Sequence, residues 1–226
     1  MSHRTIVTAA LGATLVAGSF ACEDLQDLGR HAPIADAGVP DIFIPFPSFD
    51  GAVGPAKIVF VTEGRFTGDL ATEGAAASGP AGADNLCMRE ARAAGLGATF
   101  KAWLSTTTES ARNRIAAVGP WSLVDGASCF DEVAVNGPPF CFPSVTAKGA
   151  DLKFGADLEV WTGTGTLHQL SPSGNTCRDW KSALAADQGS YGDLAFSSQW
   201  TEAQDFDGQA LSKPCSARLR LYCFEQ

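Results

Sequence analysis

The chain has 226 residues, 45% of them hydrophobic and 18% charged, which is enough for one sizeable core or two small ones. Its formal net charge is -9 at pH 7, and the sequence contains no cluster of Lys or Arg. This balance argues against nucleic acid, heparin-like polyanions and anionic lipid surfaces as partners.

The N-terminus has the form of a targeting segment. Arg4 precedes an apolar run over residues 6–17, which is too short to span a bilayer. Small residues then lead to Cys22, as in a bacterial lipobox, although Ser19 stands where such boxes usually carry Leu. We therefore predict a signal peptide over residues 1–21 and lipid attachment at Cys22. Cleavage by an ordinary signal peptidase, with free secretion, is the alternative.

Residues 22–56 are predicted to form a flexible, lipid-anchored tether. They contain scattered prolines and acids and show no sustained hydrophobic period. The β-branched run over residues 57–62 predicts the first strand of the folded domain, which we place at residues 57–226. Residues 64–82 are rich in Gly, Ala and Thr and are predicted to form an exposed loop.

The clearest pattern in the chain is a change from helical to strand period over residues 82–105. Apolar residues first recur at intervals of three and four, which predicts an amphipathic helix with one buried stripe. The stripe consists of Ala83, Leu86, Cys87, Ala91 and Ala94. Gly95 suits the left-handed end of such a helix. The period then becomes two over residues 99–105, which predicts a buried strand.

Weaker signals follow. Thr106-x-x-Glu109 has the form of a capping box and predicts a second helix through Ile115. Short strands are predicted at residues 120–124 and 158–162.

The C-terminal third is predicted to consist of long loops and a closing strand. Residues 165–200 are rich in Gly, Ser and Asp with isolated aromatics, a composition typical of irregular loops pinned at a few points. Alternation over residues 217–224 predicts the strand, with Leu219, Leu221 and Cys223 on one face.

Seven cysteines in an exported chain leave one unpaired, and lipidation of Cys22 would account for it. Six then remain, an even number that reads as three disulfides in an oxidising compartment. A turn-favouring Asn-Gly-Pro-Pro between Cys129 and Cys141 indicates a local bridge, worth about 3 kcal/mol. Buried reduced thiols and a zinc site are the alternatives, but the chain lacks a C-x-x-C pair and has few histidines.

The stretch from Gly82 to Ser105 is similar to the core helix and strand of endostatin, the C-terminal domain of collagens XV and XVIII. It resembles more closely a bacterial family of exported endostatin-like domains of unassigned function. The resemblance covers residues 57–226, because further matching features follow in order. They are Val160-Trp-Thr-Gly-Thr164, Cys177-x-x-Trp180, Trp200, Cys215 and Leu221-Tyr-Cys-Phe224.

This resemblance implies an α+β fold of the C-type-lectin-like class. It implies two helices packed on a small, mostly antiparallel sheet, with long C-terminal loops and disulfide stabilisation. It also implies a nested pairing of Cys87 with Cys223 and of Cys177 with Cys215. Cys129 and Cys141 are left to pair with each other.

The metal-binding motifs known from proteins of this fold do not occur in the sequence. The zinc-binding histidines and arginine-rich heparin surface of endostatin have no counterpart, and the Glu-Pro-Asn, Gln-Pro-Asp and Trp-Asn-Asp motifs of calcium-dependent lectins do not occur. Asp205 and Asp207, before Gly208, are the remaining calcium candidates, because alternate carboxylates before a glycine turn can supply hard oxygen ligands. A solvated turn is the alternative. No other cofactor is expected.

Catalytic motifs are also missing. The sequence holds no G-x-S-x-G, H-E-x-x-H or phosphate-binding glycine loop, and His168 has no evident nucleophile or orienting acid beside it. Asp157 and Glu159 alternate on one strand face and are the candidate acid and base of a hydrolase. Ordinary surface solvation is the alternative, and we do not expect an enzyme.

Aromatic side chains provide the last candidates. Trp121 and Tyr191 lie in loop-like segments and are candidates for stacking on sugars or filling a partner's pocket, with burial in the core as the alternative. The sequence therefore favours an exported, lipid-anchored, non-catalytic binding or adhesion module for a glycan or protein at the cell surface. A carboxylate-dependent hydrolase and a purely structural envelope protein are the alternatives. The ligand and the oligomeric state are not determined by the sequence.

Overall fold

The computed structural model describes residues 56–115, 119–130, 145–152, 158–165, 170 and 174–226. The predicted signal peptide, Cys22 and all but the last residue of the tether lie outside these ranges. Within the described part of the chain, no helix combines the length and apolarity that crossing a bilayer requires.

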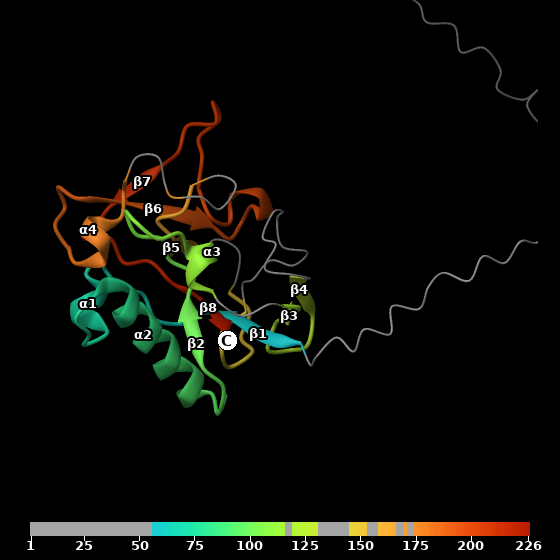
Figure 1. Cartoon of the computed structure of the whole chain (residues 1–226). Coiled ribbons are helices and arrows are strands. Elements are labelled where there is room, and N and C mark those ends of the chain that lie inside the picture. The colour runs from blue at the N-terminus through green and yellow to red at the C-terminus, as the bar shows by residue number, and fades with distance from the viewer. Residues whose placement is uncertain (1–55, 116–118, 131–144, 153–157, 166–169, 171–173) are drawn as a thin grey trace, which may run out of the picture. The chain divides into compact units, whose positions relative to one another are not determined.

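The domain is an α+β protein, as expected, but it has two sheets in place of the one small sheet that the resemblance implies (Figure 1). One sheet has five strands in the order β2-β8-β1-β3-β4, and the other has three in the order β5-β6-β7. Only the β1–β3 pair is parallel among these strands, so the sheets are mostly antiparallel. The strands of the first sheet are β1 (Lys57–Val61), β2 (Phe100–Ala102), β3 (Trp121–Ser122), β4 (Ser128–Phe130) and β8 (Tyr222–Glu225). Those of the second are β5 (Glu159–Trp161), β6 (Gln188–Asp193) and β7 (Ser212–Pro214).

The main helix is the one that the apolar stripe predicts. The helices are α1 (Leu70–Glu73), α2 (Gly79–Ala93), α3 (Ala111–Arg114), α4 (Cys177–Trp180) and the 3₁₀ turn η3 (Ser197–Gln199). In α2, the predicted inner residues from Ala83 to Ala91 are buried, and Gly95 follows with φ +77°. Ser78 caps the start, since its Oγ accepts a hydrogen bond from the Ala81 backbone N–H at 3.3 Å.

Three local predictions were wrong. The segment over residues 64–82 is not an exposed loop, because it contains α1 and the first turn of α2 and buries Phe66. The second helix is shorter than predicted and starts after Ser110, whose hydroxyl accepts from Asn113 N–H. Thr106 caps only an isolated turn before it. The predicted loops over residues 165–200 contain β6, a strand with four buried residues in a row.

Two hydrophobic cores lie on opposite faces of the five-stranded sheet. Phe60, Leu221 and Cys223 belong to the core beneath α2. Their alternate neighbours on β1 and β8, among them Val61 and Tyr222, belong to the second core. A strand whose side chains are buried on both faces is apolar throughout, which explains the sequence of β8. The predicted shared face of Leu219, Leu221 and Cys223 is confirmed.

Disulfides connect distant parts of this scaffold. Cys87 on α2 is bonded to Cys223 on β8, with 5.6 Å between their Cα atoms. Cys177 is bonded to Cys215, also with 5.6 Å between Cα atoms. These are the two pairs that the resemblance implies. Cys129 is buried and disulfide-bonded, and its predicted partner, Cys141, lies outside the described residues.

A partly buried ion pair connects α2, β2 and α3. The guanidinium of Arg114 lies 2.8 Å from Asp84 Oδ2 and donates to the backbone oxygen of Ala102 at 2.9 Å. Asp84 Oδ1 in turn accepts from the Ala102 N–H at 2.8 Å. Both charges are therefore hydrogen-bonded, which offsets the cost of removing them from water.

The turn labelled α4 is left-handed. Its four residues have φ between +50° and +64°, a conformation that costs roughly 1–2 kcal/mol for each non-glycine residue. Side-chain contacts hold it in place. Cys177 carries the disulfide, Asp179 Oδ1 accepts from the Thr107 N–H at 2.7 Å, and the Trp180 indole donates to the Ser105 oxygen at 2.7 Å.

The backbones of α1 and α2 approach each other closely at Gly74 and Gly82. A Cβ at Gly82 would lie 2.0 Å from the Leu70 oxygen, which is backbone and not free to move aside. The contact therefore depends on the missing side chain.

We expect Gly82→Ala to lower the free energy of unfolding by about 1–3 kcal/mol, although alanine is the better helix former by about 1 kcal/mol. Chemical denaturation measures the change. Gly97→Ala is the matched control, because a Cβ there meets nothing within 4 Å. Equal stability of the two variants would contradict the close approach of the helices.

A pH dependence follows from Tyr222. The residue is buried, its hydroxyl donates to the Trp200 oxygen at 2.9 Å, and burial raises its pKa well above the ordinary value of 10.0, with a further contribution from Asp193. The folded protein therefore retains this proton when the unfolded chain loses it, so stability is full below about pH 10 and falls as the pH rises further.

We expect the fall to approach about 1.4 kcal/mol per pH unit and to be shallower in Tyr222→Phe. Denaturant unfolding at a series of alkaline pH values provides the measurement. Some slope should remain, since the pKa of Tyr191 is also raised. An identical slope in the variant would show that Tyr222 does not cause it.

Candidate functional site

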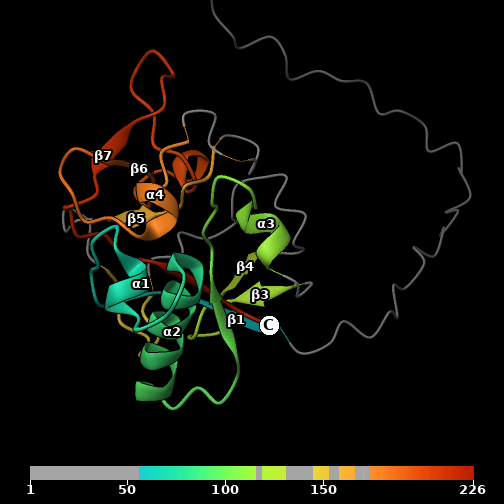
Figure 2. The same cartoon turned by 60° about the vertical axis from the view of Figure 1, so that its left-hand side comes forward.

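A hairpin over residues 203–211 projects from the three-stranded sheet (Figures 1 and 2). Asp205 N–H donates to the Gln209 oxygen at 3.0 Å, and Asp205 Oδ1 accepts from the N–H groups of Asp207 at 3.0 Å and Gln209 at 2.8 Å. Gly208 has φ +75°, which glycine adopts without strain. The Asp-x-Asp-Gly sequence thus builds a hydrogen-bonded tip.

Phe206 stands at this tip and is fully exposed, with a relative exposure of 111%. Asp205 and Asp207 flank it and are exposed as well. Burying such a side chain in a partner stabilises a complex by roughly 1.5–3 kcal/mol. An aromatic anchor between two carboxylates is therefore presented away from the domain.

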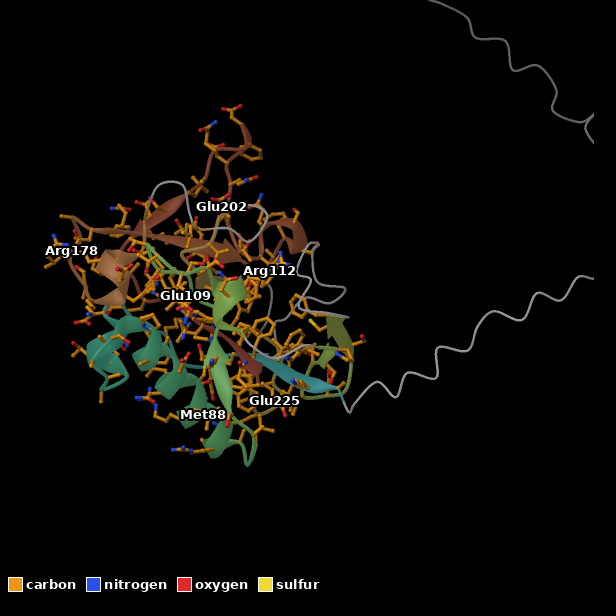
Figure 3. All side chains as sticks on the ribbon, viewed as in Figure 1. Met88, Glu109, Arg112, Arg178, Glu202 and Glu225 are labelled. Atoms are coloured by element: carbon orange, nitrogen blue, oxygen red, sulfur yellow. A yellow bond between two sulfur atoms is a disulfide. The ribbon has the colours of Figure 1, made fainter. Side chains whose placement is uncertain are left out.

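The base of the hairpin is held by the three-stranded sheet. Ala203 N–H donates to the Tyr191 oxygen on β6 at 2.7 Å, and Gln204 N–H donates to Gln199 Oε1 at 3.2 Å. Glu202, labelled in Figure 3, is buried beside these contacts, and its carboxylate accepts from the Gln204 amide at 3.3 Å. The hairpin therefore rises from a packed base.

A charged cluster crosses the same sheet. Lys213 Nζ on β7 lies 2.6 Å from Glu159 Oε2 on β5 and 5.2 Å from the centre of the Tyr191 ring on β6. Burial raises the pKa of Tyr191, and the charges of Glu159 and Asp193 raise it further. The cluster joins all three strands beneath the hairpin.

The two predicted ligand-binding aromatics are core residues instead. Trp121 is 1% exposed, packs edge-on against Phe224 with ring centres 5.4 Å apart, and donates its indole N–H to the Glu225 oxygen. Tyr191 is 7% exposed beneath Lys213. Neither ring offers a face to a sugar, because β3 and β6 place both against the sheets.

The predicted calcium residues lie together on the hairpin tip. However, Asp205 Oδ1 is used by the two backbone N–H groups of the turn. Across the described ranges, no group of three or more His, Cys, Asp and Glu side chains is placed to hold a metal ion. The structure therefore accounts for Asp205 as a turn-forming residue.

The candidate hydrolytic pair is only half described. Glu159 is held by Lys213 at 2.6 Å, whereas Asp157 and His168 lie outside the described residues.

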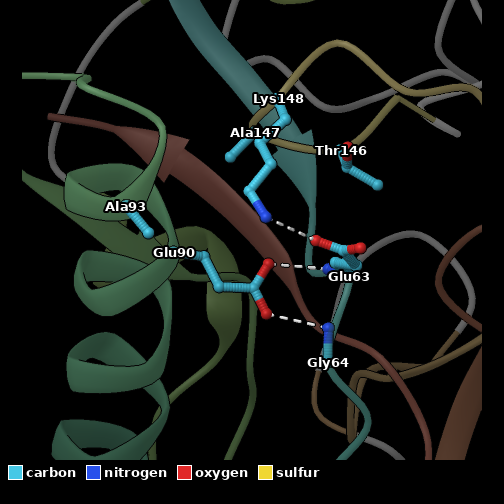
Figure 4. A pocket seen from close by; sticks show the side chains of 7 residues that line it. All are labelled: Glu63, Gly64, Glu90, Ala93, Thr146, Ala147 and Lys148. Carbon is cyan, nitrogen blue, oxygen red and sulfur yellow. Dashed lines mark hydrogen bonds and ion pairs between the residues drawn. The ribbon is translucent and has the colours of Figure 1, made fainter.

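One cavity, of about 300 Å³, lies between α2 and the turn at residues 146–148 (Figure 4). Glu90 reaches across it and accepts hydrogen bonds from the N–H groups of Glu63 at 2.6 Å and Gly64 at 2.8 Å. Lys148 lies 3.0 Å from the Glu63 carboxylate. Glu90 thus already fills the anion-binding position that these N–H groups form, and its role is to fasten α2 to the end of β1.

A larger cavity, of about 540 Å³, is bordered by another face of α2 and by α1, and we call it the α1–α2 cavity. Its lining residues are Glu73, Gly74, Ala75, Asn85, Met88, Arg89 and Arg92. Arg218 adds to this region through an ion pair with Glu73 at 3.5 Å. Two arginines of α2 therefore border one cavity, and Arg218 lies near it through Glu73.

Sequence reasoning missed Phe206 and the arginines of α2. The signal for Phe206 was present, because a large apolar residue inside an Asp-x-Asp-Gly turn has no core side to face. The arginines carried no such signal, since only packing against α1 creates the cavity that they border.

A scan of the chain against protein-family models finds no match, and a search of the curated proteins finds none either.

The cavity of Figure 4 yields a stability prediction. We expect Glu90→Gln to lower the free energy of unfolding by about 1–2 kcal/mol, because an amide accepts from one of the two N–H groups and opposes the other. Glu63→Gln, which removes only an exposed ion pair with Lys148, should change it by less than about 1 kcal/mol. Thermal or urea unfolding of both variants measures this, and a reversed order would refute the fastening role of Glu90.

Proposed function

We propose that this protein is a non-catalytic binding module whose 203–211 hairpin inserts Phe206 into a pocket of a protein ligand. The observation that carries the proposal is the complete exposure of Phe206 on a hydrogen-bonded tip. A rigid aromatic loses little conformational entropy on binding and is the side-chain type most often found at the energetic centre of interfaces.

The flanking charges define the chemistry of the ligand. Asp205 and Asp207 stand on either side of the ring, so the complementary pocket is apolar inside and basic at its rim. A rim of this kind improves association rate and specificity more than affinity, because exposed ion pairs are weak.

The proposed location is the cell surface, with residues 22–56 as the tether and Cys22 as the lipid-anchored residue. The disulfides Cys87–Cys223 and Cys177–Cys215 support export, because such bonds persist in oxidising compartments. A domain that is tethered to the cell surface and exposes Phe206 at the tip of a hairpin is suited to binding another protein at that surface.

We further propose that the fold is C-type-lectin-like and most similar to the exported endostatin-like family. The pairing of β8 with both β1 and β2 supports this, as do the two nested disulfides and the tryptophans Trp161 and Trp180 in one core. Proteins of one fold have many functions, so the proposed binding depends on the exposed hairpin and not on the fold.

Phe206→Ala provides the test. We expect saturable binding by the full-length protein in a screen of glycans, peptides and proteins, including the protein itself. The variant should lose that binding by tenfold or more, that is about 1.4 kcal/mol, with unchanged unfolding.

Phe196→Ala is the matched control, since Phe196 is also an exposed phenylalanine, at 55%, but directly precedes η3 and is not part of the hairpin. It should bind as the wild type does. Binding that survives Phe206→Ala would contradict the proposal, and loss in both variants would show that the hairpin is not the determinant.

A further inference from the structure

We propose that the ligand of the 203–211 hairpin is a second copy of this chain, and that Phe206 enters the α1–α2 cavity of that copy. The inference rests on the proposed function, because it identifies the partner of the same hairpin. It is argued from the match between the two surfaces, one acidic with an apolar tip and the other hollow with a basic rim.

The α1–α2 cavity is preformed. Its volume of about 540 Å³ falls within the roughly 300–1,000 Å³ typical of ligand pockets. Asn85 donates to the Gly74 oxygen at 2.9 Å, which fixes the wall between the helices. The partly buried Met88, whose Sδ accepts from the Phe100 N–H at 3.1 Å, offers an apolar and adaptable thioether to an incoming ring.

The charges of the rim complement the hairpin tip. Arg89 and Arg92 are both exposed and lie three residues apart, on one face of α2. The acid at this cavity, Glu73, is engaged by the Thr67 N–H at 2.8 Å and by Arg218 at 3.5 Å. The rim therefore attracts carboxylates, although the whole chain carries a net charge of -9.

The two surfaces lie at opposite ends of the domain. Figures 1 and 2 both show the hairpin at one end and the helices α1 and α2 at the other. Figure 3 labels Met88 and Glu202 at these two ends. One molecule cannot satisfy its own cavity, and the contact between copies is head to tail. Such heterologous contacts form a ring where the rotation between copies closes and an open row of copies where it does not.

A contact of one hairpin with one cavity buries much less surface than the roughly 800 Å² that each partner buries in a stable complex. The contact is therefore weak in solution and becomes effective when copies are held close together, because tethering raises the local concentration. A row of anchored copies is the assembly that this geometry supports.

Complementary variants test the inference. Phe206→Ala removes the anchor and keeps the cavity, whereas Arg92→Asp reverses the rim and keeps the hairpin. In sedimentation velocity at about 0.15 M salt, we expect the wild-type protein to associate beyond the dimer as its concentration rises. Each variant alone should associate about 30-fold more weakly. An equimolar mixture should form a one-to-one complex, since one component supplies the cavity and the other supplies the hairpin.

Phe196→Ala should associate as the wild type does. Association that survives Phe206→Ala or Arg92→Asp, or variants that fail to complement each other, would overturn the inference. A wild-type protein that remains monomeric while it binds another ligand through Phe206 would also overturn it and would leave the proposed function intact. If no binding of any kind depended on Phe206, both the inference and the proposed function would be wrong.

Discussion

The structure depends on the position of its last strand. β8 lies between β1 and β2, with Phe224 opposite both Val59 and Lys101 and with Cys223 bonded to α2. The last strand thus completes the sheet that β1 begins. Because side chains alternate along a strand, β8 sends Cys223 into one core and Tyr222 into the other, and both cores need it in register.

Around this strand, buried polar contacts hold segments that have little regular structure. The Arg114–Asp84 pair joins two helices to β2, and the Trp180 indole and the Asp179 carboxylate hold a left-handed turn against residues 105–107. Such contacts give irregular backbone a defined position. The hairpin at residues 203–211 has its own contacts at its base, from Ala203 to β6 and from Gln204 to Gln199. A base held in this way reduces the entropy lost when the hairpin binds.

Some elements could be predicted from the sequence and others could not, and the difference has a physical cause. The stripe of α2 and the alternation of β8 are repeats that burial on a given face imposes, so they could be recognised in the sequence. The segment over residues 64–82 was misread because α1 is a single turn, and one turn is stable only through packing. The period of two over residues 99–105 predicted a buried strand, and Phe100 and Trp103 are buried in the two different cores, because the sheet is covered on both faces.

In the candidate site, too, some features could be predicted from the sequence and others arise only from packing. The sequence by itself determined the acidic turn at residues 205–208, the main helix, the closing strand and the cysteines available for pairing, because each depends on local composition or on a short period. Only the tertiary structure decided that Trp121 is buried and that Arg89 and Arg92 border a cavity. Exposure and cavities arise where distant segments meet or fail to meet, and the residues of one segment do not encode the surface of another.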